Sequence, residues 1–420
     1  MNSSKSEQND PYDQNTDQNY QIALKVMTVL EDAGQQARMA GGCVRDRVLK
    51  RRPKDYDIAT SAEPDIICSI FKQKGIKTVP TGIDHGTITV VMGGQGIEVT
   101  SLRLDVATDG RRAVVSFGNS FQDDSLRRDF TINALYEDRE GEIYDFHSGL
   151  DDLKNGVLRF VGDARTRIRE DYLRILRLFR FWARFGFEPQ GDALRIIAEE
   201  VRGLEQISQE RKTSELLLIL ECPDSQKVLA TMAKTGILSQ VLGISTYTEL
   251  PKANWDALFL NNKTRGTIAC LASLIMNFDK KEDQWAAIEM LKLSRQQSDA
   301  ITILLDNLLP AQPDDPASAF DWLDRVESQL WDGVWDDFLL PSWTILKPDP
   351  RLSILNKTLL AHASRRICSL NGQYFITHLK IKPGPELGTL LHDLKTAYRR
   401  GFWNTKEEAL ALAKRRYPGK

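Results

Sequence analysis

Two short segments near the N-terminus carry residues whose types and spacing suit phosphate chemistry. The segment GGCVRD, residues 41–46, opens on two glycines, and a backbone without Cβ atoms can approach a bound group closely. Further on, Asp55 and Asp57 stand at positions i and i+2, which project from the same face of an extended strand. Paired carboxylates repel each other unless a hard cation such as Mg²⁺ lies between them, and that cation commonly carries substrate phosphates. The spacing therefore predicts a magnesium-dependent site for the phosphates of a nucleotide.

Other interpretations of these segments remain open at this point. An isolated Asp-x-Asp is usually a solvated turn, and glycosyltransferases use the same pattern to hold a metal and a nucleotide sugar. Glu98 lies between two β-branched residues in a strand-like stretch, and it could be a third carboxylate on the face of Asp55 and Asp57. It could equally be an ordinary strand residue that faces solvent.

A second candidate feature is an arginine-rich segment, residues 169–184. Its polar residues recur every three positions, as expected for a slanted stripe on a helix: Asp171, Arg174, Arg177 and Arg180. Asp171 and Arg174 are spaced so that they could pair. A carboxylate accepts from the exocyclic amine of cytosine or adenine and a guanidinium donates to ring acceptors, so this pair could select C and A over G and U.

The same segment is locally basic, because eight arginines accompany only three acidic residues between positions 159 and 184. Arginines that do not read a base suit bidentate contacts to a triphosphate. The alternative is a solvated, arginine-rich helix face.

A third cluster, Arg127-Arg128-Asp129, precedes the apolar stretch that contains Asn133. Arg128 could contact a ribose or a phosphate, or it could form a structural pair with Asp129. Asn133 stands among apolar residues, and a buried amide there would need hydrogen-bond partners.

The elements that must position these residues follow from periodicity and turn signals. An amphipathic helix is predicted over 20–40 with its end at Gly34, then a short helix after the glycines, a strand at Asp55 and a helix from Pro64. Residues 87–102 read as a β-hairpin, and the polar residues 103–124 read as a mobile loop. After Gly149 the pattern becomes helical. The tryptophans in that part are assigned to the core: Trp322, Trp331, Trp335 and Trp343.

Composition limits the classes of function. The net charge of −2 excludes a global basic field of the kind that coats nucleic acid, though not a local basic track. The five cysteines are scattered without a Cys-x-x-Cys, which favours a reducing, cytoplasmic location without disulfides or a zinc site. The polar N-terminus has no apolar signal region, and no apolar run is long enough to span a membrane.

Five segments together resemble one family. GGCVRD, DYDIAT, IEVTSLR, RRDFTINALY and REDYLRILRLFRF occur, over residues 38–187, in the order typical of class II CCA-adding tRNA nucleotidyltransferases and bacterial poly(A) polymerases. That family belongs to the DNA polymerase β-like nucleotidyltransferase superfamily. Residues 206–219 resemble its next helical motif more loosely, and KPGPELG at 382–388 resembles a tail motif of CCA-adding members.

The resemblance implies an α+β head with a small mixed sheet, followed by an all-α neck, body and tail. The predicted boundaries are a disordered leader at 1–19, a head at 20–150, a neck at 151–225, and a body and tail for tRNA binding at 226–420.

The resemblance also implies roles for individual residues. Asp55 and Asp57 match metal-binding and catalytic carboxylates, with Glu98 as a possible third catalytic residue. The nucleotide-contacting positions match Gly42, Arg45, Arg128, Asp171, Arg174, Arg177 and Arg180. Residues 103–117 match a flexible loop associated with the change from C to A addition, and their presence favours full CCA addition.

The predicted function is template-independent addition of CCA to tRNA from CTP and ATP, with Mg²⁺ as cofactor. The sequence does not predict an oligomeric state. A poly(A) polymerase, a CC-only or A-only tRNA enzyme, and a non-catalytic RNA-binding protein are the alternatives. The intact pair of Asp55 and Asp57 argues against the last, because a binder gains nothing from two carboxylates that face RNA.

Overall fold

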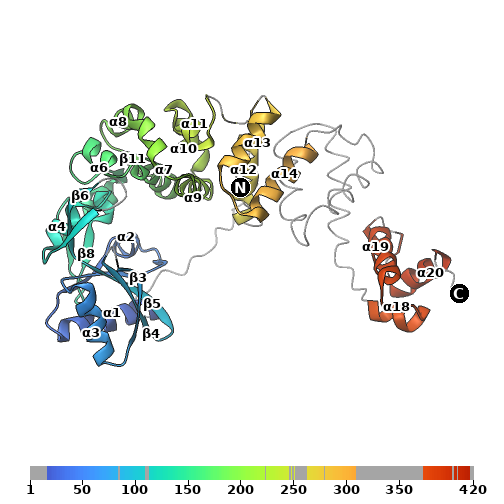
Figure 1. Ribbon diagram of the computed structural model, residues 1–420, viewed down its shortest axis with the longest axis horizontal. Helices are drawn as coiled ribbons and strands as arrows, with labels where there is room; N and C mark the ends of the chain where they lie inside the picture. The colour runs from blue at the N-terminus through green and yellow to red at the C-terminus, as the bar shows by residue number, and fades with distance from the viewer. Residues whose placement is uncertain are drawn as a thin grey trace, which may run out of the picture. The chain divides into compact units, whose positions relative to one another are not determined.

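The computed structural model describes residues 17–83, 86–108, 113–222, 224–245, 247, 250, 263–278, 280–308, 372–399, 402–403 and 405–416. The chain divides into two compact units, residues 1–248 and 249–420 (Figure 1). Each unit is described by itself below.

Helix α1, Gln18–Asp32, begins the described chain. The Asp17 side chain accepts from the backbone N–H groups of Asn19 and Tyr20, which fixes the start of the helix. Of the predicted leader, the described residues 17–19 thus belong to this helix terminus, and residues 1–16 lie outside the described chain. The helix is followed by Gly34 with a φ of 80°, which confirms the predicted end.

A seven-stranded mixed sheet forms the centre of the head in the described residues, in the order β3-β4-β5-β2-β1-β8-β9. Strands β2 and β5 are parallel, and the other neighbouring pairs are antiparallel. The bounds are β1 Ala37–Ala40, β2 Asp57–Thr60, β3 Lys77–Gly82, β4 Thr87–Met92, β5 Gln95–Ser101, β8 Leu135–Glu137 and β9 Ile143–Asp145. The predicted hairpin at 87–102 is confirmed as β4 and β5.

The two faces of the sheet differ. Helices α1 and α3, Pro64–Gln73, pack against one face, where Ile58, Ile88 and Val99 are buried (Figure 1). Alternate residues of the same strands project from the other face. There, Ala59 packs with Leu102, Phe121 and Tyr136 in a smaller cluster, which leaves the start of β2 open for a site.

The described part of residues 103–124 contains regular secondary structure that the sequence did not suggest. These residues form the antiparallel pair β6, Arg103–Thr108, and β7, Ala113–Phe117, followed by α4, Phe121–Leu126. The prediction of a loop was wrong for the described residues, because apolar and β-branched residues on both sides of the Asp-Gly pair in the sequence favour strands.

The rest of the first unit is mostly helical. Its elements are α2 Gly42–Val48, η2 Thr131–Asn133, α5 Gly149–Asn155, β10 Val157–Leu158, α6 Ala164–Glu170, α7 Leu173–Phe185, β11 Glu188–Pro189, α8 Ala193–Glu200, η3 Val201–Gln206, α9 Gln209–Leu220, α10 Ser225–Lys234 and α11 Ile237–Leu242. Helix α7 packs on α9 and α10 through its buried residues, which include Leu176 and Phe179.

In the second unit, α12 Lys263–Met276 packs with α13 Lys281–Met290 and α14 Arg295–Leu308. Helices α18 Gly372–Leu379, α19 Pro385–Arg399 and α20 Lys406–Arg416 share a core around Phe375, Leu390 and Trp403. The four tryptophans assigned to the core from the sequence lie outside the described residues. The fold class, an α+β head followed by helices, is confirmed.

Candidate active site

Two carboxylates meet where the parallel strands lie side by side. Asp57 opens β2 and its Cα partner in β5 is Glu98, so the two side chains project from the same face of the sheet. Asp55 lies two residues before Asp57, just outside the strand, and all three side chains are exposed. The sheet therefore brings Asp57 and Glu98 together, and Asp55 is near enough for its charge to act on Asp57.

The electrostatics of this cluster are unfavourable without a counter-charge. The pKa of Asp57 is raised to about 6, chiefly because enough protein surrounds this solvent-reached carboxylate to weaken its hydration. The negative charges of Glu98 and Asp55 contribute to the rise, and the Arg128 guanidinium opposes it. A cation bound here would relieve the crowding, so the donor set fits a hard metal ion.

The segment of residues 41–46 lies next to these carboxylates, because Cys43 contacts the Asp57 backbone. Gly41 has a φ of 75°, and a Cβ atom on it would lie 2.7 Å from Nη1 of Arg128, so only glycine fits this position. Helix α2 starts at Gly42. Cys43 donates its S–H to the Asp57 carbonyl at 3.8 Å, and burial raises the pKa of this thiol to about 11, so it acts in packing and not as a nucleophile.

Arg45 occupies a more internal position than the sequence suggested. Its side chain is buried, and the guanidinium donates to Asp46 at 2.8 Å and to Oδ1 of Asn133 at 2.5 Å. Phe181 and Phe185 of α7 lie within 5.2 Å and 4.8 Å of its guanidinium carbon. Arg45 thus ties α2 to the neck, and direct contact with a nucleotide stays a prediction.

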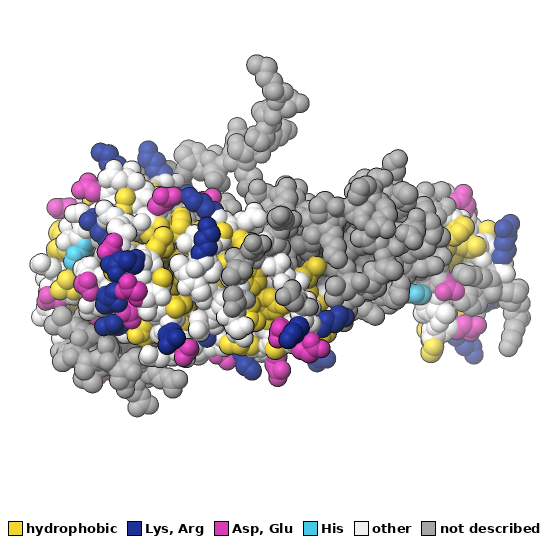
Figure 2. All heavy atoms as spheres, turned by 90° about the horizontal axis from the view of Figure 1, so that it is seen from above, with side chains coloured by type: hydrophobic (Ala, Val, Ile, Leu, Met, Phe, Trp, Pro, Cys, Tyr) yellow, Lys and Arg dark blue, Asp and Glu magenta, His cyan; other side chains and the backbone are white. Residues whose placement is uncertain are grey.

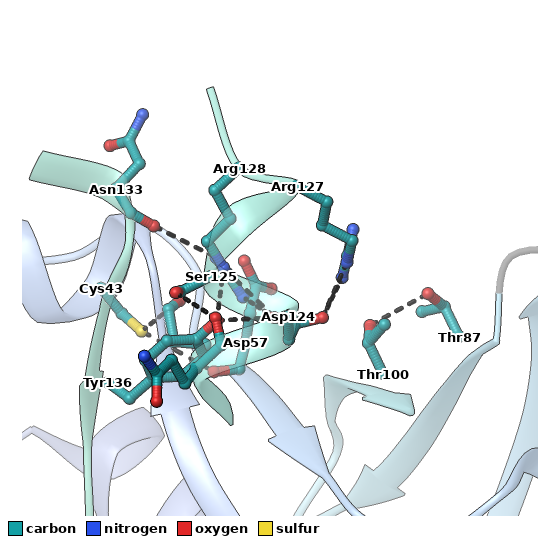
Figure 3. A network of polar contacts seen from close by, with 12 residues as sticks. Cys43, Asp57, Thr87, Thr100, Asp124, Ser125, Arg127, Arg128, Asn133 and Tyr136 are labelled. Carbon is teal, nitrogen blue, oxygen red and sulfur yellow. Dashed lines mark hydrogen bonds and ion pairs between the residues drawn. The ribbon is translucent and has the colours of Figure 1, made fainter. Parts of the chain in front are cut away.

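Arg128 lies beside Asp57 and is held on three sides (Figure 3). It donates to the Asp124 carboxylate at 3.2 Å, to the Tyr136 hydroxyl at 3.0 Å and to the Asn133 carbonyl at 3.2 Å. The alternative of an Arg128–Asp129 pair was wrong, because the chain turns between these residues and sends their side chains to different partners.

Asp129 and Asn133 connect the head with helix α7. Asp129 accepts from Nε of Arg177 at 2.6 Å and from Nδ2 of Asn133 at 3.0 Å, and Asn133 accepts from Arg45. The expectation that a buried Asn133 would need partners is confirmed. Further along α7, Arg180 donates to Glu215 of α9 at 2.9 Å.

Asp171 and Arg174 do not pair through their side chains. The predicted continuous helix breaks at Asp171, whose φ of −152° is extended and separates α6 from α7. One Asp171 oxygen accepts from the N–H of Leu173 and the other from Arg211, both at 3.0 Å. Arg174 instead donates to Glu170 at 2.6 Å and to the carbonyl of Arg127 at 2.8 Å. The i,i+3 spacing misled because Asp171 is not in the helix.

The positive charges of the arginine-rich segment are paired with carboxylates. Each of the eight arginines between positions 159 and 184 is ion-paired with an aspartate or a glutamate, as Arg165 is with Glu199 and Glu200. Figure 2 accordingly shows Lys and Arg side chains interspersed with Asp and Glu side chains. The local excess of arginine in the sequence is balanced by carboxylates from elsewhere in the chain, and a triphosphate would have to share or displace these partners.

Comparisons with known proteins agree with this architecture. Residues 37–159 match the sequence model of the Poly A polymerase head domain, and residues 186–244 match the family described as "Probable RNA and SrmB- binding site of polymerase A". The chain is 32% identical to CCA tRNA nucleotidyltransferase 1, mitochondrial, of Danio rerio, over 89% of this chain and 86% of that protein. The chain belongs to the family of CCA tRNA nucleotidyltransferases.

Bacterial members of the family are similar over nearly their whole length. A CCA-adding enzyme of Streptococcus pyogenes serotype M5 is 33% identical, over 91% of this chain and 93% of that protein. The crystal structure of the Bacillus stearothermophilus CCA-adding enzyme in complex with CTP has a TM-score of 0.69 and 28% identity, and the match covers 96% of this chain and 98% of that one.

The part of the chain that the structure describes contains no ready-made cage of three or more His, Cys, Asp or Glu side chains for a metal. Within the same residues, no helix is both long and apolar enough to cross a bilayer.

Sequence reasoning missed several residues that hold the site together. Asp124, Tyr136, Glu215 and Arg211 each bind a predicted site residue. Their signal in the sequence is weak, because they lie in different elements from their partners. The adjacent Asp123-Asp124 before Arg127-Arg128 was the one available cue, since carboxylates three or four residues before arginines suit helical pairing.

Proposed function

We propose that this protein adds the sequence CCA to the 3′ end of tRNA, using CTP and ATP and releasing pyrophosphate. The observation that carries this proposal is the similarity to CCA-adding enzymes along nearly the whole of both chains. The head geometry supports it, because Asp57 and Glu98 share one face of the sheet with Arg128 beside them. Such a site suits transfer of a nucleotidyl group.

The reaction joins the 3′-hydroxyl oxygen of the tRNA to the α-phosphorus of the nucleotide. The hydroxyl O–H bond breaks and its proton passes to solvent, while the bond from that phosphorus to the bridging oxygen of the β-phosphate breaks and pyrophosphate leaves with both electrons of that bond. Arg128 lies where it can donate to the nucleotide, since its side chain keeps 20% of its surface exposed.

Nucleotidyltransferases of this family use a divalent metal, and we propose Mg²⁺ held by Asp55 and Asp57, with Glu98 beside them. When bound, the cation supplies positive charge that acidifies the attacking hydroxyl and stabilises the leaving pyrophosphate. The raised pKa of Asp57 supports the assignment, because a group so placed gains most from a nearby positive charge.

Selection of C and A is assigned to Asp171 and Arg174, and further nucleotide contacts to Gly42, Arg45, Arg177 and Arg180. Four of these residues are engaged with other partners: Asp171 with Arg211, Arg174 with Glu170, Arg177 with Asp129 and Arg180 with Glu215. A nucleotide base would take the place of Arg211 on Asp171, and both of these side chains are partly exposed.

A poly(A) polymerase is the strongest alternative, because the head matches a model named for that activity. Enzymes that add only CC or only A are the next. We propose a cytoplasmic location, since the four described cysteines are all free, as in a reducing compartment. Cell fractionation would test it, and recovery within mitochondria would contradict it.

The deciding experiment uses tRNA transcripts that lack the last three nucleotides. Purified protein, Mg²⁺ and each labelled nucleotide, alone and in mixture, are followed on a sequencing gel. Two C additions followed by one A, with no further growth, are expected. A long A tract on an unrelated RNA would instead identify a poly(A) polymerase, and a stop after CC would identify a CC-only enzyme.

A further inference from the structure

Tyr56 stands between the two carboxylates assigned to the metal, and it differs from both in its burial. Asp55 and Asp57 are exposed, whereas Tyr56 is 3% exposed. Neighbouring side chains of an extended chain project to opposite sides, so the tyrosine points into the protein while the carboxylates point out of it. The positions of both carboxylates therefore depend on what holds the tyrosine.

The start of helix α1 holds Tyr56. Oδ2 of Asp17 accepts from the Tyr56 hydroxyl at 3.1 Å. Oδ1 of Asp17 accepts from the backbone N–H groups of Asn19 at 2.9 Å and Tyr20 at 3.4 Å, and the side chain of Asp17 is buried. One carboxylate thus caps the helix with one oxygen and anchors the tyrosine with the other.

Other contacts add to this anchor. The Tyr20 ring lies 5.9 Å from the Tyr56 ring, and the guanidinium carbon of Arg47 lies 4.3 Å from the Tyr20 ring centroid. Nε of Arg52 lies 3.6 Å from Oδ2 of Asp17, but the Arg52 side chain is 73% exposed, and such a pair contributes little. The main supports of Tyr56 are therefore the buried hydroxyl–carboxylate bond and the ring of Tyr20.

The carboxylates need such support because their charges oppose one another. The negative charges of Glu98 and Asp55 act on Asp57, and like charges at short range repel. Strand β2 begins at Asp57, so Asp55 lies before the regular strand. A buried anchor on the residue between them opposes the separation of Asp55 and Asp57.

We propose that Tyr56 is a positioning residue for the metal site, held by Asp17 through its hydroxyl and by Tyr20 through its ring. The inference rests on the proposed function, which assigns a divalent cation to Asp55 and Asp57. A site whose ligands are already in place loses less conformational freedom when it binds. Release of Tyr56 would let the two carboxylates separate, and the cation would bind more weakly.

Four variants of the full-length protein test this role. Tyr56→Phe removes the hydroxyl and keeps the ring. Asp17→Ser retains a favourable N-cap, but its single oxygen cannot serve both the helix and the tyrosine. The double variant shows whether the two changes act through one bond. Tyr144→Phe is the control, because the Tyr144 hydroxyl donates to Asp138 at 3.0 Å and β1 and β8 lie between its strand, β9, and β2.

Binding of Mn²⁺, which accepts the same oxygen ligands as Mg²⁺, is measured on the protein alone by electron paramagnetic resonance. The Mg²⁺ dependence of CMP incorporation and Tm are measured beside it. Tyr56→Phe and Asp17→Ser should each weaken Mn²⁺ binding, and raise the Mg²⁺ concentration for half-maximal rate, by about threefold to tenfold. At saturating Mg²⁺ their kcat should return to near the wild-type value. The double variant should bind Mn²⁺ no more weakly than Asp17→Ser alone, and Tyr144→Phe should bind it like the wild type.

Unchanged Mn²⁺ affinity in Tyr56→Phe would overturn the proposal, even if Tm fell. Effects that add in the double variant, or an equal loss of affinity in Tyr144→Phe, would overturn it as well. Should Asp17→Ser not fold, Tyr56→Phe still decides the question. A wild-type protein that binds Mn²⁺ no better than Asp57→Ala would instead refute the metal assignment of the proposed function, so the two failures are distinct.

Discussion

At the start of β2, the Asp57 carboxylate is pushed toward its neutral form by partial burial and by Glu98, and toward its ionised form by Arg128. The ionised Asp57 carboxylate therefore lowers the stability of the metal-free folded protein at neutral pH. A bound cation would stabilise this ionised form. The same arrangement that suits the chemistry therefore weakens the fold locally, and the two effects can be measured separately.

The catalytic contribution of Asp57 is tested by Asp57→Ala. We expect incorporation of CMP to fall by about 10³-fold or more, because a group that stabilises charge in the transition state is removed. Affinity for tRNA, measured by filter binding, should be unchanged. Near-normal incorporation would refute the metal assignment.

The electrostatic cost at Asp57 predicts a pH dependence of stability. The folded-state pKa of about 6 lies above the ordinary value of 3.8, so the folded protein binds more protons than the unfolded chain between these values. Stability from this group is therefore fully present below the unfolded pKa and is lost as pH rises through about 6.

The variant Asp57→Asn removes this titration. In metal-free buffer, we expect the variant to be more stable than the wild type at pH 7, and the difference to vanish near pH 4. Denaturant unfolding at several pH values measures it. A difference that is constant with pH would contradict the raised pKa.

Selection by Asp171 is tested with two substitutions. Asp171→Ala removes the acceptor for the Leu173 N–H as well as the acceptor for a base, so we expect lower stability, by about 0.5–2 kcal/mol, and increased use of UTP and GTP. Asp171→Asn retains an acceptor for Leu173 but presents an amide donor to the base. It should keep the stability and lose the selection, and unchanged selection in both variants would refute the role.

The sequence identified most of the candidate residues but few of their partners. Asp57 and Glu98 could be placed together because strand periodicity decides which side chains share a face, whereas Asp55 lies before the strand. The partners of Arg45, Arg177 and Arg180 could not be predicted, since Asn133, Asp129 and Glu215 lie 35 to 88 residues away from them. Such contacts depend on how the elements pack, and they produce no periodic pattern in the sequence.

At the scale of elements, the hairpin at 87–102 was predicted correctly, whereas the break between α6 and α7 was not. Apolar spacing continues through residues 169–184, so periodicity alone predicts one helix. The break is fixed by packing: Gly203 of η3 lies against Tyr172, and a Cβ atom there would fall 1.9 Å from the tyrosine ring. The position of Asp171 thus depends on a glycine in another element.

This packing predicts the effect of Gly203→Ala. The added methyl must displace the Tyr172 ring, which should cost about 1–3 kcal/mol and relax nucleotide selection through the neighbouring Asp171. Urea unfolding and the CTP-to-UTP ratio measure the two effects. Gly388→Ala is the control, because nothing lies within 4 Å of its Cβ position in α19. An equal effect of both substitutions would contradict the argument.

At the scale of the whole molecule, we expect nucleotide chemistry in the first unit and part of the tRNA-binding surface in the second, besides residues 186–244 of the first, which match the family described as a probable RNA-binding site. The unit of residues 1–248 contains every candidate catalytic and nucleotide-contacting residue, together with a core of its own. In the second unit, the helices α18, α19 and α20 are held by a separate apolar cluster. The described parts of the two units thus have separate apolar cores.

This division predicts the behaviour of a fragment that ends at Thr248. The fragment should fold and retain a KM for CTP within about threefold of the full-length value, because the nucleotide site is complete within it. Its KM for tRNA should rise by about tenfold or more, since phosphate contacts assigned to the helical body and tail are lost and each of them adds to RNA affinity. Steady-state kinetics on tRNA transcripts, with the full-length protein as control, measure both values. If KM for tRNA stayed unchanged, the surface that binds the acceptor arm would belong to the first unit. Substitution of the paired arginines of α6 and α7 would then test which of them contact the RNA.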